Sequence, residues 1–396
     1  MKRFKYVILV FPVILFLLIV CSENPSPASS NNNVKGTFAI INGFLINGSG
    51  SDPIPSSIVI IQDGLIKSVG TNSTLEIPSE AEIIDLQGSY ILPGLINTHV
   101  HSAYNDFNLK EWAKAGITTV RDLGNLANSP EEGFSIRNTL LNDNENSRLV
   151  AAGPLVTTVG GYGNYPVTSS SDAQLKTNGL INAGADLIKI AIEDNLQGRT
   201  WPMLSIDEIK MIVQTTHNRN KQAAAHISRA KHLDMAIKGG VDDVVHMVID
   251  NLPDSLITFM IEKNMYWVPT LELWKSVSEK YNLNWIAIAK NNLKRFVQAG
   301  GKVALGTDYD GYVTPFDLGM PITEIRLMKE AGMTPMQIII AGTLNAASVC
   351  NLKNELGTIE PGKIADIIIV KNNPLEDLES LLNVQMVIHN GEIITD

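Results

Sequence analysis

The chain has 396 residues, of which 44% are hydrophobic, so it is long enough for one large domain with a full core and a smaller domain. Its net charge of −10 argues against nucleic acid as a partner, because that binding depends on Lys and Arg side chains that neutralise phosphates. The two cysteines, Cys21 and Cys350, provide neither a disulfide framework nor a cysteine metal site.

Residues 1–21 have the pattern of a targeting segment. Basic residues precede an apolar run over 6–20 that is shorter than the roughly 20 residues a membrane-spanning helix needs. The run ends in Leu-Ile-Val-Cys21, which resembles a bacterial lipoprotein signal, although Val20 replaces the usual small residue. We expect an exported protein anchored to a membrane by a lipid on Cys21, with an uncleaved signal anchor or ordinary cleavage as alternatives. Residues 22–35 predict a flexible tether.

Residues 36–92 and 355–396 predict a single small β-sandwich domain built from both chain ends. The pairs Asp63-Gly64 and Asn390-Gly391 are typical of tight hairpin turns. Neither stretch makes a convincing sheet alone, so we expect the two to combine. The strand-like runs cover 37–43, 57–64, 65–69, 365–370 and 386–394.

Residues 93–354 predict an α/β fold, a (β/α)₈ TIM barrel, because eight short apolar strands alternate with stretches of helical periodicity. One helical stretch, 205–219, opens with Ser205 and Glu208, the signature of a capping box. The predicted strands cover 96–101, 116–122, 148–153, 186–190, 223–226, 244–246, 266–270 and 304–308.

Five of these strands finish on side chains that can bind metal. On the first strand His99 and His101 are two residues apart, so both project from one face and can hold one ion. The active site of such a barrel lies at the C-terminal ends of its strands, where every one of these side chains is found. They predict a buried metal centre formed by His99, His101, Lys189, His226, His246 and Asp308.

Several motifs carry a resemblance to a known family over roughly residues 36–396. They are Pro93-Gly94-Leu95-Ile96 before the paired histidines, 116–122, 185–190, 305–308 and the tail from Gly332 to Asp366. On these motifs the chain resembles the amidohydrolase superfamily, and within it the imidazolonepropionase-like and Xaa-Pro or Xaa-Arg dipeptidase-like members. Asn97 stands where many members have Asp. Gly160-Gly-Tyr162-Gly stands where the dipeptidases often have Gly-Gly-His-Gly, which weakens the case for a dipeptide substrate.

The resemblance implies a binuclear centre. Lys189 would be carboxylated on its side-chain nitrogen and bridge two divalent metal ions, with burial favouring the neutral amine that takes up carbon dioxide. His99, His101 and Asp308 would complete one site, and His226 and His246 the other. A metal-bridging hydroxide would cleave the C–N bond of an amide, cyclic amide or peptide, and Asp308 would pass its proton to the leaving amine. These ligands suit zinc, with manganese, iron and cobalt as alternatives.

Two other functions compete with this one. A mononuclear deaminase or chlorohydrolase of the same superfamily would need a glutamate near His226 as proton shuttle, and residues 226–232 contain none; it would not need Lys189. A non-catalytic binding lipoprotein would be expected to have lost ligands. Esterase, lactonase or phosphotriesterase activity stays open, because the same hydroxide attacks those centres.

Individual residues also have structural interpretations. Lys189 could pair with a carboxylate, Asp308 could cap a helix, and Arg121 with Asp122 could form ion pairs. His217, His232 and His389 are expected to be structural or solvated. The substrate is expected to be a small molecule, and a homo-oligomer is possible. Candidate substrate contacts are Tyr104, Arg121, Tyr162 and Tyr309.

Overall fold

The computed structural model describes residues 36–124, 129–310 and 315–395. The predicted targeting segment, the lipid anchor on Cys21 and the tether fall on residues 1–35, outside the described residues, and stay predictions. Within the described ranges no helix is both long and apolar enough to cross a membrane.

The large domain is a TIM barrel whose eight strands belong to two parallel sheets, one with the order β6-β7-β8 and one that contains β11-β14-β15-β16-β17. Backbone hydrogen bonds connect Asp186 N with Ala151 O (2.9 Å), and Thr98 N with Leu305 O (2.8 Å), so the segment after β17 lies beside β6. The strands are almost fully buried, which is why they appear in the sequence as continuous apolar runs. They are β6 (Leu95–Val100), β7 (Ile117–Asp122), β8 (Arg148–Ala151), β11 (Ile188–Ala191), β14 (Ala223–His226), β15 (Asp243–Val245), β16 (Tyr266–Val268) and β17 (Lys302–Val303).

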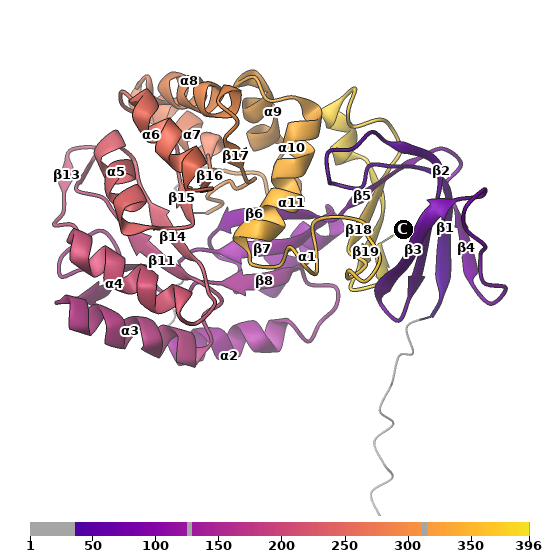
Figure 1. Ribbon diagram of the computed structural model, residues 1–396, viewed down its shortest axis with the longest axis horizontal. Coiled ribbons are helices and arrows are strands. Elements are labelled where there is room, and N and C mark those ends of the chain that lie inside the picture. Colours follow the sequence, from indigo (N-terminus) through magenta and orange to yellow (C-terminus); the bar gives the residue numbers. More distant parts are fainter. Residues whose placement is uncertain (1–35, 125–128, 311–314, 396) are drawn as a thin grey trace, which may run out of the picture. The chain divides into compact units, whose positions relative to one another are not determined.

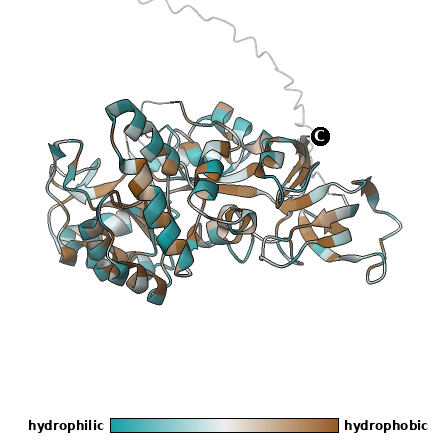
Figure 2. Cartoon of the chain, turned by 90° about the horizontal axis from the view of Figure 1, so that it is seen from above, coloured by the Kyte–Doolittle hydropathy of each residue, from teal (hydrophilic) through white to brown (hydrophobic). Residues whose placement is uncertain are grey.

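Helices cover the outside of these strands (Figure 1). Hydrophobic residues concentrate on the strands and hydrophilic residues on the outer faces of the helices (Figure 2). The capping box predicted at Ser205 is confirmed, since the Glu208 carboxylate accepts from Ser205 N at 2.8 Å. The helices are α1 (Asp106–Lys114), α2 (Pro130–Leu140), α3 (Ser170–Ala183), α4 (Ile206–His217), α5 (Ala230–Gly239), α6 (Asp254–Glu262), α7 (Leu271–Tyr281), α8 (Trp285–Gln298), α9 (Ile322–Glu330), α10 (Pro335–Gly342), α11 (Leu344–Val349) and the 3-10 helix η1 (Leu378–Leu382).

Short additional strands follow two of the barrel strands. The pair β9 (Val156–Thr158) and β10 (Tyr165–Val167) lies in the connection after β8. The hairpin β12 (Asn195–Leu196) and β13 (Arg199–Thr200) lies in the connection after β11. Both connections leave the C-terminal ends of the strands, so they border the predicted active site.

The small domain combines both ends of the chain, as predicted. Strand β5 from the N-terminal stretch pairs antiparallel with β18 from the C-terminal stretch, with Leu92 opposite Ile368. Both predicted hairpin turns adopt the left-handed conformation, with φ of 54° at Asp63 and 50° at Asn390, each followed by a positive-φ glycine. The boundaries 36–92, 93–354 and 355–396 remain predictions. The strands are β1 (Phe38–Leu45), β2 (Ile54–Gln62), β3 (Leu65–Thr71), β4 (Glu82–Asp85), β5 (Tyr90–Pro93), β18 (Ile367–Val370), β19 (Val384–His389) and β20 (Glu392–Thr395).

Candidate metal centre

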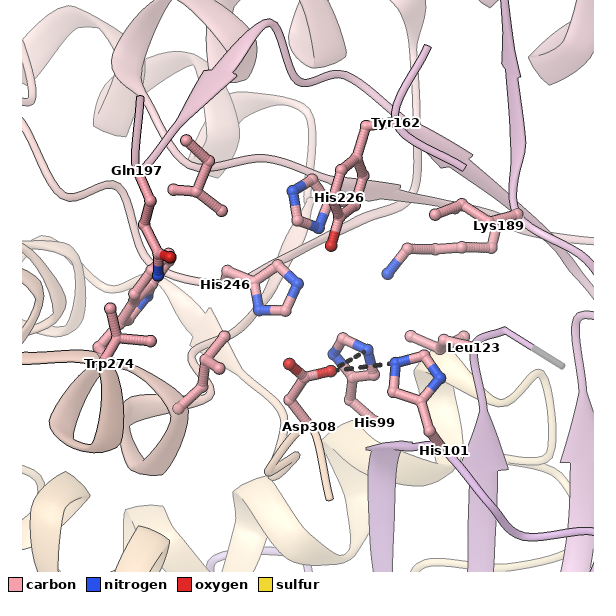
Figure 3. A pocket seen from close by; sticks show the side chains of 14 residues that line it. His99, His101, Leu123, Tyr162, Lys189, Gln197, His226, His246, Trp274 and Asp308 are labelled. Carbon is pink, nitrogen blue, oxygen red and sulfur yellow. Dashed lines mark hydrogen bonds and ion pairs between the residues drawn. The ribbon is translucent and has the colours of Figure 1, made fainter. Parts of the chain in front are cut away.

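The six predicted ligands line one cavity at the C-terminal ends of the barrel strands (Figure 3). The paired histidines come from the end of β6, where the alternation of the strand turns both rings toward the cavity. Lys189 lies within β11, His226 ends β14, His246 follows β15, and Asp308 follows β17. The TIM barrel therefore brings together side chains that are up to 209 positions apart in the sequence (99 to 308).

One carboxylate oxygen joins the paired histidines. Asp308 Oδ1 lies 3.0 Å from His99 Nε2 and 3.1 Å from His101 Nε2. One ligand atom each from His99, His246 and Asp308 lie within 4.8 Å of one another, and all three residues are buried. Three donors at this separation can converge on one cation.

The hydrogen bonds of His101 test whether these residues fit a metal ion. His101 Nδ1 lies 3.0 Å from the carbonyl oxygen of Gly124, an acceptor, so Nδ1 carries a proton. The lone pair of a neutral His101 is then on Nε2 and faces the Asp308 carboxylate, an arrangement that needs a positive charge between the two atoms. Burial lowers the pKa of His101, but Asp308 outweighs that effect and raises this pKa to about 9. With this pKa, a proton on Nε2 supplies the positive charge between His101 and Asp308. A bound cation would supply the same charge, so the residues fit a metal site.

The second pair of histidines lies beside the first. The ring centroids of His226 and His246 are 4.6 Å apart, and those of His99 and His246 are 5.0 Å apart. Thr270 Oγ1 lies 2.8 Å from His246 Nδ1, which fixes the ring and leaves Nε2 for the cavity. Burial and nearby positive groups lower the pKa values of His99 and His246 well below the usual range, so both rings are neutral and able to bind metal.

The backbone at these positions is strained. His246, Thr270 and Asp308 are non-glycine residues with φ of 72°, 46° and 65°, in the left-handed region that costs such residues free energy. Each directly follows, or follows closely, the end of a barrel strand. Strain of this kind at the ends of three strands is characteristic of sites where side-chain direction matters more than backbone stability.

Lys189 is a buried amine that has no counter-ion within the part of the chain that the structure describes. It is 2% exposed, and no carboxylate of the described residues lies within ion-pair distance of its Nζ. Burial is the main cause that lowers the pKa of Lys189 to about 7, and Arg121 contributes in the same direction. A substantial fraction of the amine is therefore neutral near pH 7. The alternative of a salt-bridged lysine is not supported.

A model of the amidohydrolase family matches residues 90–394. The chain belongs to the amidohydrolase family. The chain is 24% identical to an ochratoxinase from Aspergillus niger over 93% of its own length and 88% of the relative. It is 22% identical to an imidazolonepropionase from Thermoplasma volcanium, covering 87% of the chain and 92% of the relative. This amidohydrolase is thus a metal-dependent hydrolase acting on carbon–nitrogen bonds.

Solved structures support the fold of this amidohydrolase. A Xaa-Pro dipeptidase with bound methionine superimposes with a TM-score of 0.79 at 25% identity, covering 90% of this chain and 99% of that one. The A. niger ochratoxinase superimposes with a TM-score of 0.79 at 20% identity, covering 91% and 96%. Both similarities extend over the barrel and the small domain together.

The site of this amidohydrolase contains one acidic residue, Glu193, that the sequence patterns did not indicate. Glu193 is buried, and its Oε2 lies 3.4 Å from His226 Nε2 and 3.8 Å from His232 Nδ1. Residues 226–232 contain no glutamate, but the barrel brings Glu193, two residues after the end of β11, beside His226. A buried Glu directly after an apolar strand was the available signal. The absence of a glutamate no longer separates the binuclear from the mononuclear hypothesis.

The four candidate substrate contacts have different surroundings. Tyr162 lines the cavity, and its ring centroid is 4.6 Å from that of His226. Tyr309 packs edge-on against Trp112, 5.1 Å away, and Tyr104 packs against the core; neither is among the described residues that line the cavity. The prediction for Arg121 requires correction, because its side chain is fully buried in a pair with Asp243 and cannot reach a substrate.

The histidines expected to be structural lie outside the cavity. His217 Nε2 lies 2.9 Å from Asp242 at a half-exposed position. His232 is buried, and its Nε2 lies 2.9 Å from Asp194, so it is structural and not solvated. His389 is buried in the small domain.

Proposed function

We propose that this amidohydrolase cleaves an amide, cyclic amide or peptide bond with two divalent metal ions, for which zinc suits the ligands best. His99, His101 and Asp308 would hold one ion, and His226 and His246 the other. Lys189, as its N6-carboxylated form, would bridge them. The observation that carries this proposal is the buried Lys189 amine, which shares a cavity with four histidines and has no carboxylate partner among the described residues.

The ions, when bound, would supply a hydroxide nucleophile at neutral pH and polarise the scissile carbonyl. The residues of the chain supply the remaining functions. Burial alone would raise the pKa of Asp308, but its contacts with His99 and His101 outweigh this effect and hold the pKa well below its usual range. Asp308 is therefore ionised and able to accept a proton and pass it to the leaving amine. Tyr162, whose ring packs over His226, would contact the substrate.

A mononuclear deaminase is the second candidate. It is supported by Glu193 beside His226 and by 25% identity to an adenine deaminase of Ruegeria sp., of which the alignment covers 59%. In that case Glu193 would carry the proton and Lys189 would have no catalytic role. Metal content separates the two candidates.

Elemental analysis of protein reconstituted with zinc and bicarbonate tests the metal count. We expect close to two ions per chain, together with release of amine from a panel of amides, cyclic amides and dipeptides. One ion at saturation, with release of ammonia from aminopurines, would favour the mononuclear deaminase instead. Two ions without hydrolysis of any amide would contradict the proposed reaction but not the proposed centre.

The Asp308→Asn variant tests the proton shuttle. Asn keeps the shape and one coordinating oxygen but cannot carry a proton, so we expect kcat to fall by roughly 10²–10⁴ while metal content changes much less. Loss of the metals in this variant would show that Asp308 acts mainly as a metal ligand. Normal turnover with metals bound would contradict the mechanism.

On the sequence of residues 1–21, we also propose that the protein is exported and anchored through a lipid on Cys21. Cys21→Ser should then release the protein from the membrane fraction of an expressing bacterium. Retention of the variant at the membrane would favour an uncleaved signal anchor.

A further inference from the structure

The cavity around the metal ligands has an apolar wall. Trp274 is 1% exposed, and its ring centroid lies 6.0 Å from that of His246, so a group bound next to the ligands contacts the indole. The wall is assembled from four connections that follow β7, β8, β11 and β16. Its apolar members are Leu123, Leu155, Leu196, Leu273, Trp274 and Val277.

Apart from the ligands, the described residues that line the same cavity offer no cation for an anionic substrate group. Apart from the ligands, the polar side chains that line its described part are Tyr162 and Gln197, both uncharged at neutral pH. Lys189 is the sole lysine among the described lining residues, and no arginine lines that part of the cavity. The internal segments outside the described residues, 125–128 and 311–314, contain neither Lys nor Arg in their sequence.

The position of Gln197 is set by a tight turn. Gln197 and Gly198 connect β12 to β13 with φ of 51° and 80°, the backbone of a type I′ hairpin. Trp201, just after the hairpin, packs edge-on against Tyr162 with ring centroids 5.2 Å apart. Gln197 is exposed, so this uncharged amide lies at the mouth of the cavity.

The charges already present are unfavourable for a second anion. Asp308 lines the cavity, and Glu193 is buried beside His226. A carboxylate next to the scissile bond would lose its hydration against Leu and Trp side chains without gaining a partner, which is strongly unfavourable. Metal ions in the proposed centre would be engaged with the scissile carbonyl.

We propose that the site selects neutral amides with an apolar or aromatic group beside the scissile bond, and discriminates against dipeptides and N-acyl amino acids that carry a free carboxylate there. The inference rests on the proposed hydrolysis of C–N bonds and adds the class of substrate. It is consistent with Tyr162 standing where the dipeptidases often have His in their glycine-rich loop.

The test uses matched substrate pairs with the zinc-loaded enzyme. Each pair shares the acyl group, and its leaving amines differ by one carboxylate, such as N-acetyl-2-phenylethylamine and N-acetylphenylalanine. We expect kcat/KM to be higher by about tenfold or more for the neutral member, since burying an unpaired carboxylate is costly. A preference for the carboxylate members would overturn this inference and leave the hydrolase intact. No hydrolysis in any pair would contradict the proposed function itself.

Two variants test whether the missing cation causes the preference for neutral substrates. Gln197→Arg places a cation at the mouth of the cavity and should raise kcat/KM for the carboxylate members. The ratio of kcat/KM between the neutral and the carboxylate member should therefore decrease by about tenfold. Gln174→Arg, at an exposed position of α3, is the matched control and should leave the ratio unchanged. An unchanged ratio in Gln197→Arg would contradict the electrostatic explanation.

Arg199 is the cation of the β12–β13 hairpin. Replacing it tests the opposite hypothesis, in which an arginine binds the carboxylate of the substrate. It is exposed and lies opposite Leu196 in the β12–β13 register. If Arg199 turns toward bound substrate, Arg199→Ala should lower activity on the carboxylate members alone. That result would identify a carboxylate-binding arginine and refute the inference; equal small effects on both members would support it.

Discussion

Two buried polar residues at the two ends of strand β15 differ in whether the fold supplies a charged partner for them. Asp243, at the start of this strand, accepts hydrogen bonds from Arg121 Nη1 at 3.0 Å and Nη2 at 2.8 Å. His246, just after its end, has left-handed backbone and lies among two other histidines. Arg121 also donates to Thr98 O at 2.7 Å and Val349 O at 2.9 Å, so the Arg121–Asp243 pair is extensively hydrogen-bonded.

These two surroundings distinguish a buried polar group that stabilises the fold from one that serves a functional site. Around Arg121 the fold supplies a partner for the buried charge, as a stable interior requires. Around His246 it brings together imidazole lone pairs and the buried Lys189 amine, which suits the metal ions and the carboxylated lysine that we propose. A residue type alone does not distinguish the two cases. The two cases are distinguished by whether neighbouring residues satisfy the hydrogen-bonding capacity of the buried group.

Replacing Lys189 with Ala should have the largest effect on catalysis. Loss of the proposed bridge should lower kcat/KM by roughly 10³ or more, and short carboxylic acids at high concentration should restore part of it. Steady-state rates and metal content are the measurements. Lys238→Ala, on the exposed face of α5, is the control. Unchanged turnover in Lys189→Ala would refute the carbamate assignment and make this lysine structural.

Replacing Arg121 should instead affect stability. Arg121→Ala leaves the Asp243 carboxylate buried and unpaired, so the free energy of unfolding should fall by roughly 3–5 kcal/mol. Urea denaturation measures this, and turnover per folded molecule should change little. The exposed pair of Lys290 and Glu330 gives the control, where Lys290→Ala should cost under about 1 kcal/mol. A stable but inactive Arg121→Ala would contradict the purely structural role assigned to this residue.

Glu193→Gln tests whether the carboxylate beside His226 positions a ligand or moves a proton. A positioning role predicts metal affinity or activity weakened by roughly 10–100-fold, because the orientation of His226 is less well fixed. A proton-shuttle role predicts a larger fall in kcat with metal affinity retained. Metal titration in parallel with kcat therefore decides between the binuclear hydrolase and the mononuclear deaminase.

The smallest effect concerns Glu324, a buried carboxyl in α9 that accepts from the backbone N–H groups of Leu271 and Glu272. Burial raises the pKa of Glu324 to about 8, above its unfolded value. The folded state therefore binds this proton more tightly, and the associated stability is complete below the unfolded pKa and lost as pH rises through about 8. The Tm should fall between pH 6 and 9.

Glu324→Gln removes that titration, so its Tm should depend less on pH, with a difference on the order of 2–4 °C by calorimetry. Glu330→Gln, an exposed member of the same helix, is the control. An equally steep pH dependence in Glu324→Gln would assign the effect to other groups.

The sequence alone determined the barrel strands and the candidate ligands. Strands buried on both faces must be apolar, so a His, Lys or Asp at the end of such a run stands out without any structure. The turns at Asp63 and Asn390 were equally predictable, because few residues besides Asn, Asp and Gly accept the left-handed backbone.

The tertiary structure decided what depends on partners distant in sequence. Arg121 could not be assigned from its neighbours, since its partner Asp243 is 122 positions away. Glu193 reaches His226 because β11 and β14 are adjacent in the barrel, and the apolar wall combines four separate connections. Such contacts are set by strand order and packing, so sequence patterns identified the candidate ligands, while the tertiary structure revealed the surroundings that bear on their metal count and substrate.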